Sequence, residues 1–456
     1  MLAEETSCPD GGTGIAQLSA RLDSLGRTKS GNRKGEEELP RMTATRRGWF
    51  GMFLAVTVAV AGALPAWAQT PAPAPAGETK PDDKTEAEKP KTLWDEFKLF
   101  SYIEMSGTFN LHGGSKGVPG STSDGWTNAQ RFYDINQGFT FNMAEFSIKR
   151  DPDEKFPFGM GLVLTAGADA QKNHSIGLLR SETDQFPFRN DPWFDIQEAY
   201  ISARIPIGDG PVLKVGKFVT PIGYEVIESP NNLNFSRNFL YTFAIPFTHT
   251  GVVLSYSFTD WLSAQAGLVL GWDRSNLENA GPSGLGQVAV TPIKDLPIAF
   301  NFIVGPEKSG DKNPIRGLMD VTVTYTGIKD FTFGFNFDYG IQANDVFLTS
   351  QGLGNQSADW YGLAGYIAYD FLKDFRASLR QEWFRDADGT RTLTGGGVNL
   401  LSTTATIQYN IWRGLYARGE YRHDQADENV FGCRPNRGCD NKSQDTLSVS
   451  FYYKFF

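Results

Sequence analysis

The sequence predicts an all-β fold, a transmembrane antiparallel β-barrel of about 16 strands. Three observations lead to this prediction. Apolar and polar residues alternate in one segment after another, which is the period of a strand with one apolar face. Most segments have at least the ~9–11 residues that a tilted strand needs to cross a bilayer. Long and short connections alternate between them, as in bacterial barrels with long external loops and short periplasmic turns.

A signal peptide is predicted over residues 42–68. Arg46 and Arg47 precede the apolar run 50–64, and a small-residue cleavage site ends at Ala68. A membrane anchor is the alternative, but it would need about 20 apolar residues and the run is shorter.

The rest of the N-terminal region is predicted to be unstructured. If Met42 is the true start, residues 1–41 are an upstream artefact. Residues 69–94 are rich in Pro and Ala and then in charges, which predicts a disordered periplasmic spacer before the barrel domain, 95–456. Residues 1–68 hold eight basic and seven acidic residues, so the remainder has 35 basic and 45 acidic residues, a net charge of -10. This charge does not favour binding to nucleic acid.

Sixteen segments carry the alternating pattern. In Phe331–Tyr339, for example, every second residue is aromatic and the residues between are small or polar. The predicted strands are 100–112, 138–150, 158–170, 195–206, 211–220, 248–258, 261–272, 284–292, 297–305, 317–327, 331–341, 358–371, 374–386, 400–412, 414–424 and 443–455. A sheet in lipid must close, because lipid cannot pair an open edge. A barrel of this size encloses a water-filled lumen, and an even strand number puts both termini at the periplasmic end.

The third long connection, 221–247, is the predicted constriction. It is too aromatic and apolar for a solvated external loop, so it should bury itself. Folding into the lumen would bring Glu225, Glu228 and Arg237 to the charges of the wall. Packing against the barrel rim or against a neighbouring subunit is the alternative.

Charged residues on the polar face of the strands are predicted to line the lumen, because Arg or Lys facing lipid costs about 2–4 kcal/mol at the midplane. The predicted lumen residues are Glu104, Glu198, Arg204, Asp320, Asp338, Arg376, Arg380, Glu382, Arg418, Glu420 and Arg422. Opposite charges would create a transverse field that selects polar solutes. The alternative is that any wet lumen needs polar residues. The arginines favour anions locally, whereas the net charge argues against general anion selectivity.

Cys433 and Cys439, in the eighth long loop, predict a local disulfide in an exported chain. A metal site is the weaker alternative, because CRPNRGC contains no His and has the wrong spacing. The four histidines are scattered and do not have the spacing of a metal site. We therefore predict neither an enzyme nor a cofactor, with a barrel hydrolase as the alternative to test.

The chain ends on an aromatic strand, which predicts the closing strand of the barrel and part of its interfacial aromatic girdle. The lipid-facing set is Leu447, Val449, Phe451, Tyr453 and Phe455. Phe456 is one position past this set, so either it turns outward or the register slips by one near the end. Tyr453, Phe455 and Phe456 are predicted to act as the signal for the assembly machinery.

Several phrases resemble the putative beta-barrel porin-2 (OmpL-like) family of Gram-negative outer-membrane proteins. They are LKVGKFVTPIGYEVIESPNN, SRNFLYTFAIPFTHTGV, GLVLGWDRSN, DWYGLAGYIAYDF and EYRHDQADENVF. The resemblance covers most of 95–456 and implies a porin for passive diffusion of small hydrophilic solutes, without defined catalytic residues. Its motif residues at the ends of the third loop are Lys217, Pro221, Gly223, Tyr224, Glu225, Phe247, Thr248, His249 and Thr250.

The sequence thus predicts a passive porin in the outer membrane of a Gram-negative bacterium. Its expected partners are outer-membrane lipid, small hydrophilic solutes or ions, the outer-membrane assembly machinery and further copies of the chain in a homo-oligomer. The alternative is a structural or adhesive barrel whose loops bind an outside partner and whose lumen is plugged.

Overall fold

The computed structural model describes residues 96–111, 130, 138–179, 192–277, 279–308, 311–343, 356–432 and 439–455. The predicted upstream segment, signal peptide and spacer lie outside these residues, as do Cys433 and Phe456. Within the described residues, no helix is long and apolar enough to span a membrane.

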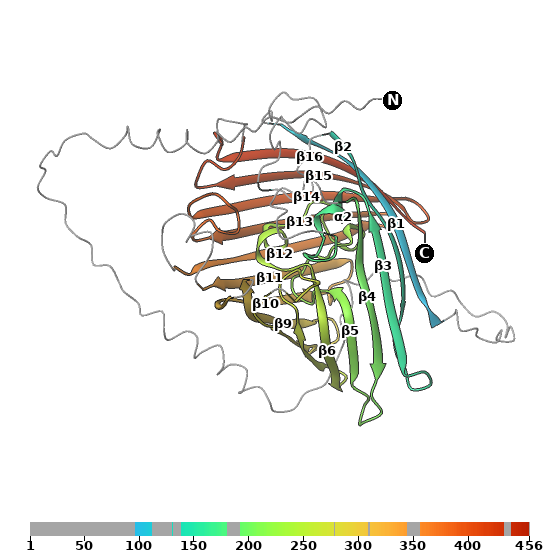
Figure 1. Cartoon of the computed structure of the whole chain (residues 1–456). Helices are drawn as coiled ribbons and strands as arrows, with labels where there is room; N and C mark the ends of the chain where they lie inside the picture. The colour runs from blue at the N-terminus through green and yellow to red at the C-terminus, as the bar shows by residue number, and fades with distance from the viewer. Residues whose placement is uncertain are drawn as a thin grey trace, which may run out of the picture. The chain divides into compact units, whose positions relative to one another are not determined.

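The described chain forms a closed antiparallel barrel (Figure 1), so the predicted fold is confirmed. The strands are β1 (Lys98–Asn110), β2 (Gly138–Arg150), β3 (Phe158–Ala166), β4 (Phe194–Arg204), β5 (Val212–Val219), β6 (Thr248–Thr259), β7 (Leu262–Val269), β8 (Ser283–Val290), β9 (Ile298–Lys308), β10 (Asp311–Tyr325), β11 (Phe331–Gln342), β12 (Ala358–Leu372), β13 (Phe375–Asp386), β14 (Val398–Trp412), β15 (Leu415–Ala426) and β16 (Ser443–Lys454). Each strand pairs with its neighbours in sequence, and β16 pairs with β1 to close the ring.

Strands β9 and β10 are longer than the alternating pattern predicts. Only residues 309–310 separate them, whereas the sequence analysis placed a connection over 306–316. Pairing continues past the apolar alternation, with Ile315 opposite Pro306 after a register shift. Backbone hydrogen bonds do not require alternating side chains. The strands can therefore extend beyond the segment in which apolar and polar residues alternate.

The two faces of the sheet differ as the alternation predicts. On β13, Leu379 points outward and is 46% exposed, while its neighbour Arg380 points inward and is 0% exposed. Aromatic residues on the outside stack across strands, as the half-buried Phe375 does on the exposed Tyr409 with ring centroids 4.4 Å apart. The outer face is therefore apolar, and the polar side chains gather on the inner wall.

The last strand keeps one register to its end. The pairing of β16 with β1 runs without a shift from Asn110 opposite Thr446 to Tyr102 opposite Lys454. The Phe455 N–H then donates to the Ser101 carbonyl at 2.9 Å, and the Phe455 side chain is 46% exposed. The register slip, which was one of the two alternatives for the end of the chain, does not occur up to this residue.

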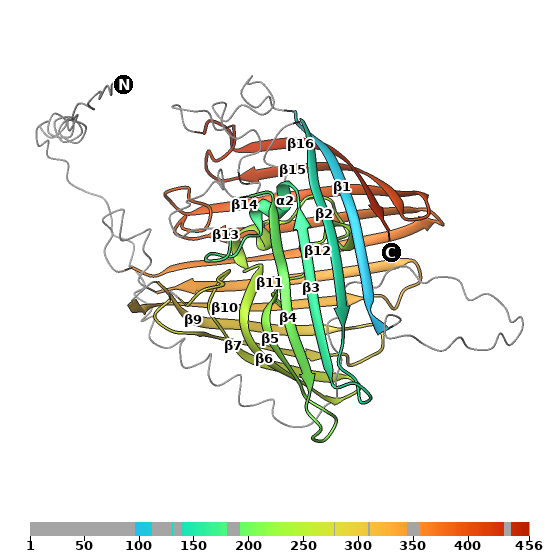
Figure 2. The same cartoon turned by 45° about the vertical axis from the view of Figure 1, so that its right-hand side comes forward.

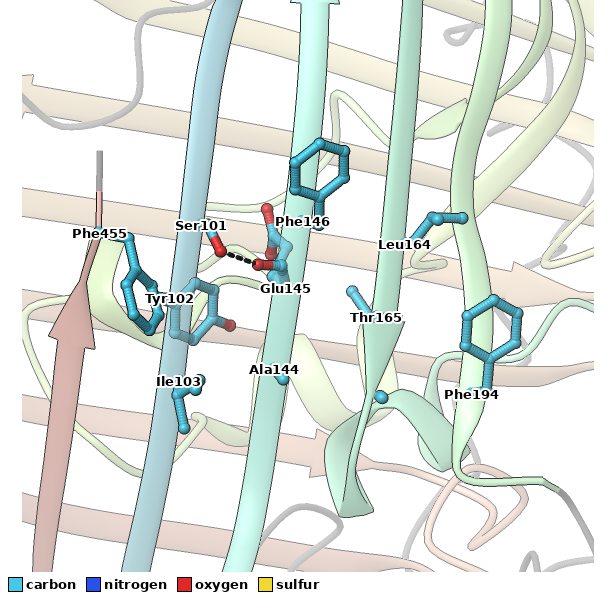
Figure 3. A pocket seen from close by; sticks show the side chains of 11 residues that line it. Ser101, Tyr102, Ile103, Ala144, Glu145, Phe146, Leu164, Thr165, Phe194 and Phe455 are labelled. Carbon is cyan, nitrogen blue, oxygen red and sulfur yellow. Dashed lines mark hydrogen bonds between the residues drawn. The ribbon is translucent and has the colours of Figure 1, made fainter.

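Two register shifts mark the wall formed by β1 to β4. They lie between Glu104 and Met105 and between Val163 and Leu164. A mainly apolar pocket of about 470 Å³ lies beside them (Figure 3). Its lining includes the exposed aromatic residues Phe146, Phe194 and Phe455. An extra residue in one strand bends the sheet locally, which leaves such hollows.

Two connections carry short helices. Helix α2 (Ala168–Lys172) follows β3 and contacts β2, β3 and β4. Between β5 and β6 lie a 3₁₀ turn, η4 (Ser229–Asn231), and a π-helical turn, η5 (Leu240–Ala244), which contacts β11 and β12. In Figure 2, α2 lies at the end of β3, beside β4.

Candidate functional site

The connection between β5 and β6, residues 220–247, is the most heavily bonded loop among the described residues, and we call it L3. Most of its residues are buried and none is exposed. Its hydrogen bonds reach inward side chains of β1, β4, β11, β12, β13, β14 and β15, which are distributed around the wall. L3 therefore lies inside the barrel and spans its lumen.

Glu225 joins L3 to β13 and β12. Its Oε1 pairs with the Arg380 guanidinium at 2.7 Å and accepts the Tyr366 hydroxyl at 3.2 Å. Its Oε2 accepts the Asn238 backbone N–H at 2.8 Å, so the same carboxylate ties two parts of L3 together. A buried carboxylate is stable only when hydrogen bonds also satisfy its remaining lone pairs. Here three donors, from Arg380, Tyr366 and Asn238, bind the Glu225 carboxylate.

Two wall carboxylates accept backbone N–H groups of L3. Glu420 accepts from Phe235 at 2.7 Å and from Ser236 at 3.0 Å. Glu382 accepts from Phe239 at 2.5 Å. A loop buried away from water needs partners for its backbone groups, and these carboxylates supply them.

The arginines of β13 and β15 bind the backbone carbonyls of L3. Arg380 donates to the Ser236 carbonyl at 2.6 Å, and Arg418 donates to the Ser229 carbonyl at 3.0 Å. Arg422 donates to the Arg237 carbonyl at 2.5 Å. The predicted inward direction of these arginines agrees with the structure, and each holds the loop. Their role in ion selectivity stays a prediction.

The other two predicted loop residues brace L3 in different ways. Glu228 accepts the Gln197 side-chain amide of β4 at 2.6 Å. Arg237 turns back on the loop and donates to the carbonyls of Ile227 and Phe235 at 2.5 and 3.0 Å. Of the three, Glu225 and Glu228 reach the wall directly through these bonds.

An apolar contact secures the second half of L3. Phe243 stacks on Phe384 of β13 with ring centroids 5.8 Å apart. The Trp360 indole N–H donates to the Ala244 carbonyl at 3.2 Å, and the Arg391 guanidinium donates to the Phe243 carbonyl at 2.6 Å. The aromatic composition that predicted burial of this loop therefore serves to pack it against β12 and β13.

The remaining predicted lumen residues lie elsewhere on the wall. Glu104 accepts the Ser229 hydroxyl of L3 at 3.1 Å. Glu198 pairs with Lys149 at 2.8 Å, and Arg204 pairs with the exposed Glu154 at 3.1 Å near the short-turn end of β4. Glu198 and Arg204 are therefore not brought together with the arginines of β13 and β15, whereas Glu104 lies near Arg418, because both bond to the Ser229 hydroxyl.

Asp320 and Asp338 are directly opposite each other on β10 and β11, and both are buried. Asp320 accepts the side-chain amides of Asn301 and Asn336 at 2.5 and 2.6 Å. Asn336 in turn accepts the Tyr224 N–H of L3 at 3.4 Å.

Cys439 is disulfide-bonded. Among the described residues, no group of three or more His, Cys, Asp and Glu could hold a metal ion.

Sequence reasoning missed the polar partners that complete this site. Tyr366, Thr406 and Asn238 each bond to the residues described above. Alternation alone could have placed Tyr366 and Thr406 on the inner wall. It could not have shown which loop atoms they meet, because L3 has no regular period.

The comparisons with known proteins concern the family and the fold of the chain. A family model described as "Putative beta-barrel porin-2, OmpL-like" matches residues 106–455. The chain belongs to this porin family. It is therefore an outer-membrane protein of a channel-forming type. No curated protein matches the chain.

Solved structures share the fold of this porin at low identity. The outer membrane channel DcaP of Acinetobacter baumannii is 11% identical, covers 79% of this chain and 97% of its own, and gives a TM-score of 0.51. An anion-selective porin from Comamonas acidovorans is 9% identical over 79% of this chain and 99% of its own, with a TM-score of 0.49. The likeness to DcaP supports the barrel fold alone.

Proposed function

We propose that this porin gives passive diffusion of small hydrophilic solutes or ions through a charged, water-filled lumen that L3 narrows. The observation that carries the proposal is the attachment of L3 to opposite charges of the wall. Glu225 of L3 pairs with Arg380 of β13, and Glu420 of β15 accepts a backbone N–H of L3. A loop held in this way is rigid enough to define a constriction.

Charged groups at a constriction select among solutes by the field they create. The inner wall carries arginines together with carboxylates such as Glu382 and Glu420 on β13 and β15, and further carboxylates on β1, β2 and β4. Polar solutes that orient in such a field would cross more easily than apolar ones. Homo-oligomer formation and recognition by the assembly machinery stay predictions, as does the absence of catalysis.

Conductance of the purified mature protein in planar bilayers tests the proposal. We expect discrete channel openings, and we expect Arg380→Met to raise the unitary conductance because L3 loses its anchor on β13. If the wild-type protein shows no openings at voltages that other porins tolerate, the proposal is wrong.

A plugged structural or adhesive barrel is the second candidate. The burial of wall residues such as Arg380 and Glu382, both at most 1% exposed, favours it because solvent does not reach them. The two candidates make opposite predictions in the same bilayers. A plugged barrel gives no openings in the wild type and gains them only when L3 is released.

A further inference from the structure

The inner wall of β13 to β16 carries a basic and aromatic patch at its short-turn end. The patch consists of Arg376, Gln408, Tyr416, Arg418, Tyr452 and Lys454, and we call it the basic patch. Cross-strand pairing brings these residues together. Arg376 is opposite Gln408, which is opposite Arg418, and Tyr416 is opposite Tyr452 one step nearer the short turns. Lys454 follows on β16.

The basic patch is held in shape by its own contacts. The rings of Tyr416 and Tyr452 stack with centroids 4.7 Å apart, and the Arg418 guanidinium lies 4.7 Å above the Tyr452 ring. Gln408 accepts the Arg418 Nε–H and the Tyr452 hydroxyl, both at 3.0 Å. The basic patch is thus a preorganised surface of stacked aromatic rings with cations beside them.

The patch has more positive than negative charge. Lys454 lies 5.8 Å from the Phe100 ring centroid and 5.9 Å from that of Tyr452, and donates to the Pro230 carbonyl at 3.5 Å. Its charged neighbours are Arg418 and Arg376. Among the described residues it forms no ion pair with a carboxylate.

Two carboxylates face the patch. Asp370 of β12 makes a bidentate pair with Arg376, at 2.7 Å to Nε and 2.8 Å to Nη2. Glu104 of β1 reaches Arg418 only through the Ser229 hydroxyl, to which Arg418 donates at 3.1 Å. Three cations against these two carboxylates leave the patch one positive charge in excess.

Exposure decides which charges a solute can meet. Glu104 and Arg418 are 0% and 1% exposed beneath L3. By contrast, the Arg376 side chain is 19% exposed, and Gln408, Tyr416 and Lys454 are half-buried. The solvent-facing edge of this wall therefore presents Arg376 and Lys454.

We propose that the basic patch is a binding subsite for small solutes that carry an oxyanion, a carboxylate or a phosphate group, on the short-turn side of L3. Lys454 and Arg376 would bind the oxyanion by charge-assisted hydrogen bonds, and the Tyr416 ring would cover the adjoining part of the solute. The inference rests on the proposed porin function and names the solute class that the lumen favours.

The test uses wild-type channels in planar bilayers under a KCl gradient, with inorganic phosphate as the probe, added to each side in turn. We expect a reversal potential that indicates chloride preference and a reduction of the current by phosphate that is stronger from one side. In Lys454→Gln and Arg376→Gln the ratio of chloride to potassium permeability should fall roughly fivefold at low salt, since one unit charge near the path has an effect of this order.

The matched control is Lys98→Gln, which removes a charge of the exposed pair with Asp151 at the start of β1. It should leave selectivity unchanged. Cation preference in the wild type, or equal phosphate block in wild type and both lumen variants, would overturn the subsite. These outcomes need open channels, so they are distinct from failure of the porin proposal, in which no channel opens.

Discussion

Arg376 and Arg380 point inward from the same strand, four residues apart, yet they lie in different surroundings. Arg380 is fully buried beneath L3, where it binds Glu225 and the Ser236 carbonyl. Arg376 is partly exposed and pairs with Asp370 on the neighbouring strand. The same residue type on the same face thus anchors a loop in the middle of the barrel and faces solvent near the short turns. Strand alternation determines the direction of a side chain, whereas the loop inside the barrel determines its environment.

Arg380→Met should have the largest effect on stability. The variant leaves the buried carboxylates of Glu225 and Glu382 without the guanidinium group that pairs with them. Breaking a buried charge pair typically lowers the free energy of unfolding by about 3–5 kcal/mol. Urea unfolding in a lipid environment, followed by Trp fluorescence, measures the change in the free energy of unfolding.

Arg376→Met is the matched variant for this comparison. Its pair with Asp370 is partly exposed, so the expected loss is about 1 kcal/mol or less. Equal losses in the two variants would mean that the middle and short-turn regions do not differ in the way we describe.

Glu420→Gln should have an intermediate effect. The carboxylate accepts two backbone N–H groups of L3 and the Thr406 hydroxyl at 2.8 Å. The amide keeps one acceptor oxygen and loses the charge, so we expect a loss of about 1–3 kcal/mol. Unitary conductance should rise as L3 loosens. An unchanged conductance together with a lower stability would indicate that L3 stays in place without this anchor.

The fold was predictable from the sequence because lipid outside and water or polar loop inside impose a period of two on every strand. That period placed Arg380 inward and Leu379 outward correctly. It failed at β9 and β10, where pairing continues past the alternating pattern with Asp311 opposite Lys308 and Ile315 opposite Pro306. The register shift after Glu104 was also missed, although β2 carries a mark of it: the exposed side chains change from odd positions, Phe139 and Phe141, to an even one, Phe146.

The site was predictable only in part. The aromatic composition of 221–247 indicated a buried loop, and Glu225, Glu228 and Arg237 were among its charged residues. The pairing of Glu225 with Arg380 was not predictable, because the two residues are 155 positions apart and L3 has no regular period. The solvent exposure of the basic patch was also not predictable from the sequence, because it depends on which part of the wall L3 covers and not on the strands themselves.

Asp370→Asn should sharpen the comparison from the solvent-facing side. The variant removes the carboxylate that neutralises Arg376, so the basic patch gains one unit of positive charge. We expect the ratio of chloride to potassium permeability to rise a few-fold at low salt and to return toward the wild-type value at high salt. An unchanged ratio would mean that solutes do not sense the charge at Arg376. Stability should change little, because the pair is partly exposed.

The smallest expected effect concerns a carboxylate outside both regions. Asp153, in the turn between β2 and β3, accepts the backbone N–H of Phe156 and that of Lys155, each at 2.8 Å, and pairs with Arg150 at 3.0 Å. The hydrogen bond from Phe156, more than the other contacts, lowers the pKa of Asp153 below the usual value of 3.8.

A lowered pKa means that ionised Asp153 stabilises the folded chain above pH 3.8, and that this stabilisation is lost as the pH falls through the lowered pKa. Asp153→Asn should therefore lower the urea midpoint slightly at pH 6, with a gap to wild type that closes under strongly acidic conditions. If the difference in urea midpoint between wild type and variant is the same at every pH, the charge of Asp153 does not stabilise the turn. The side chain would then contribute only through its shape.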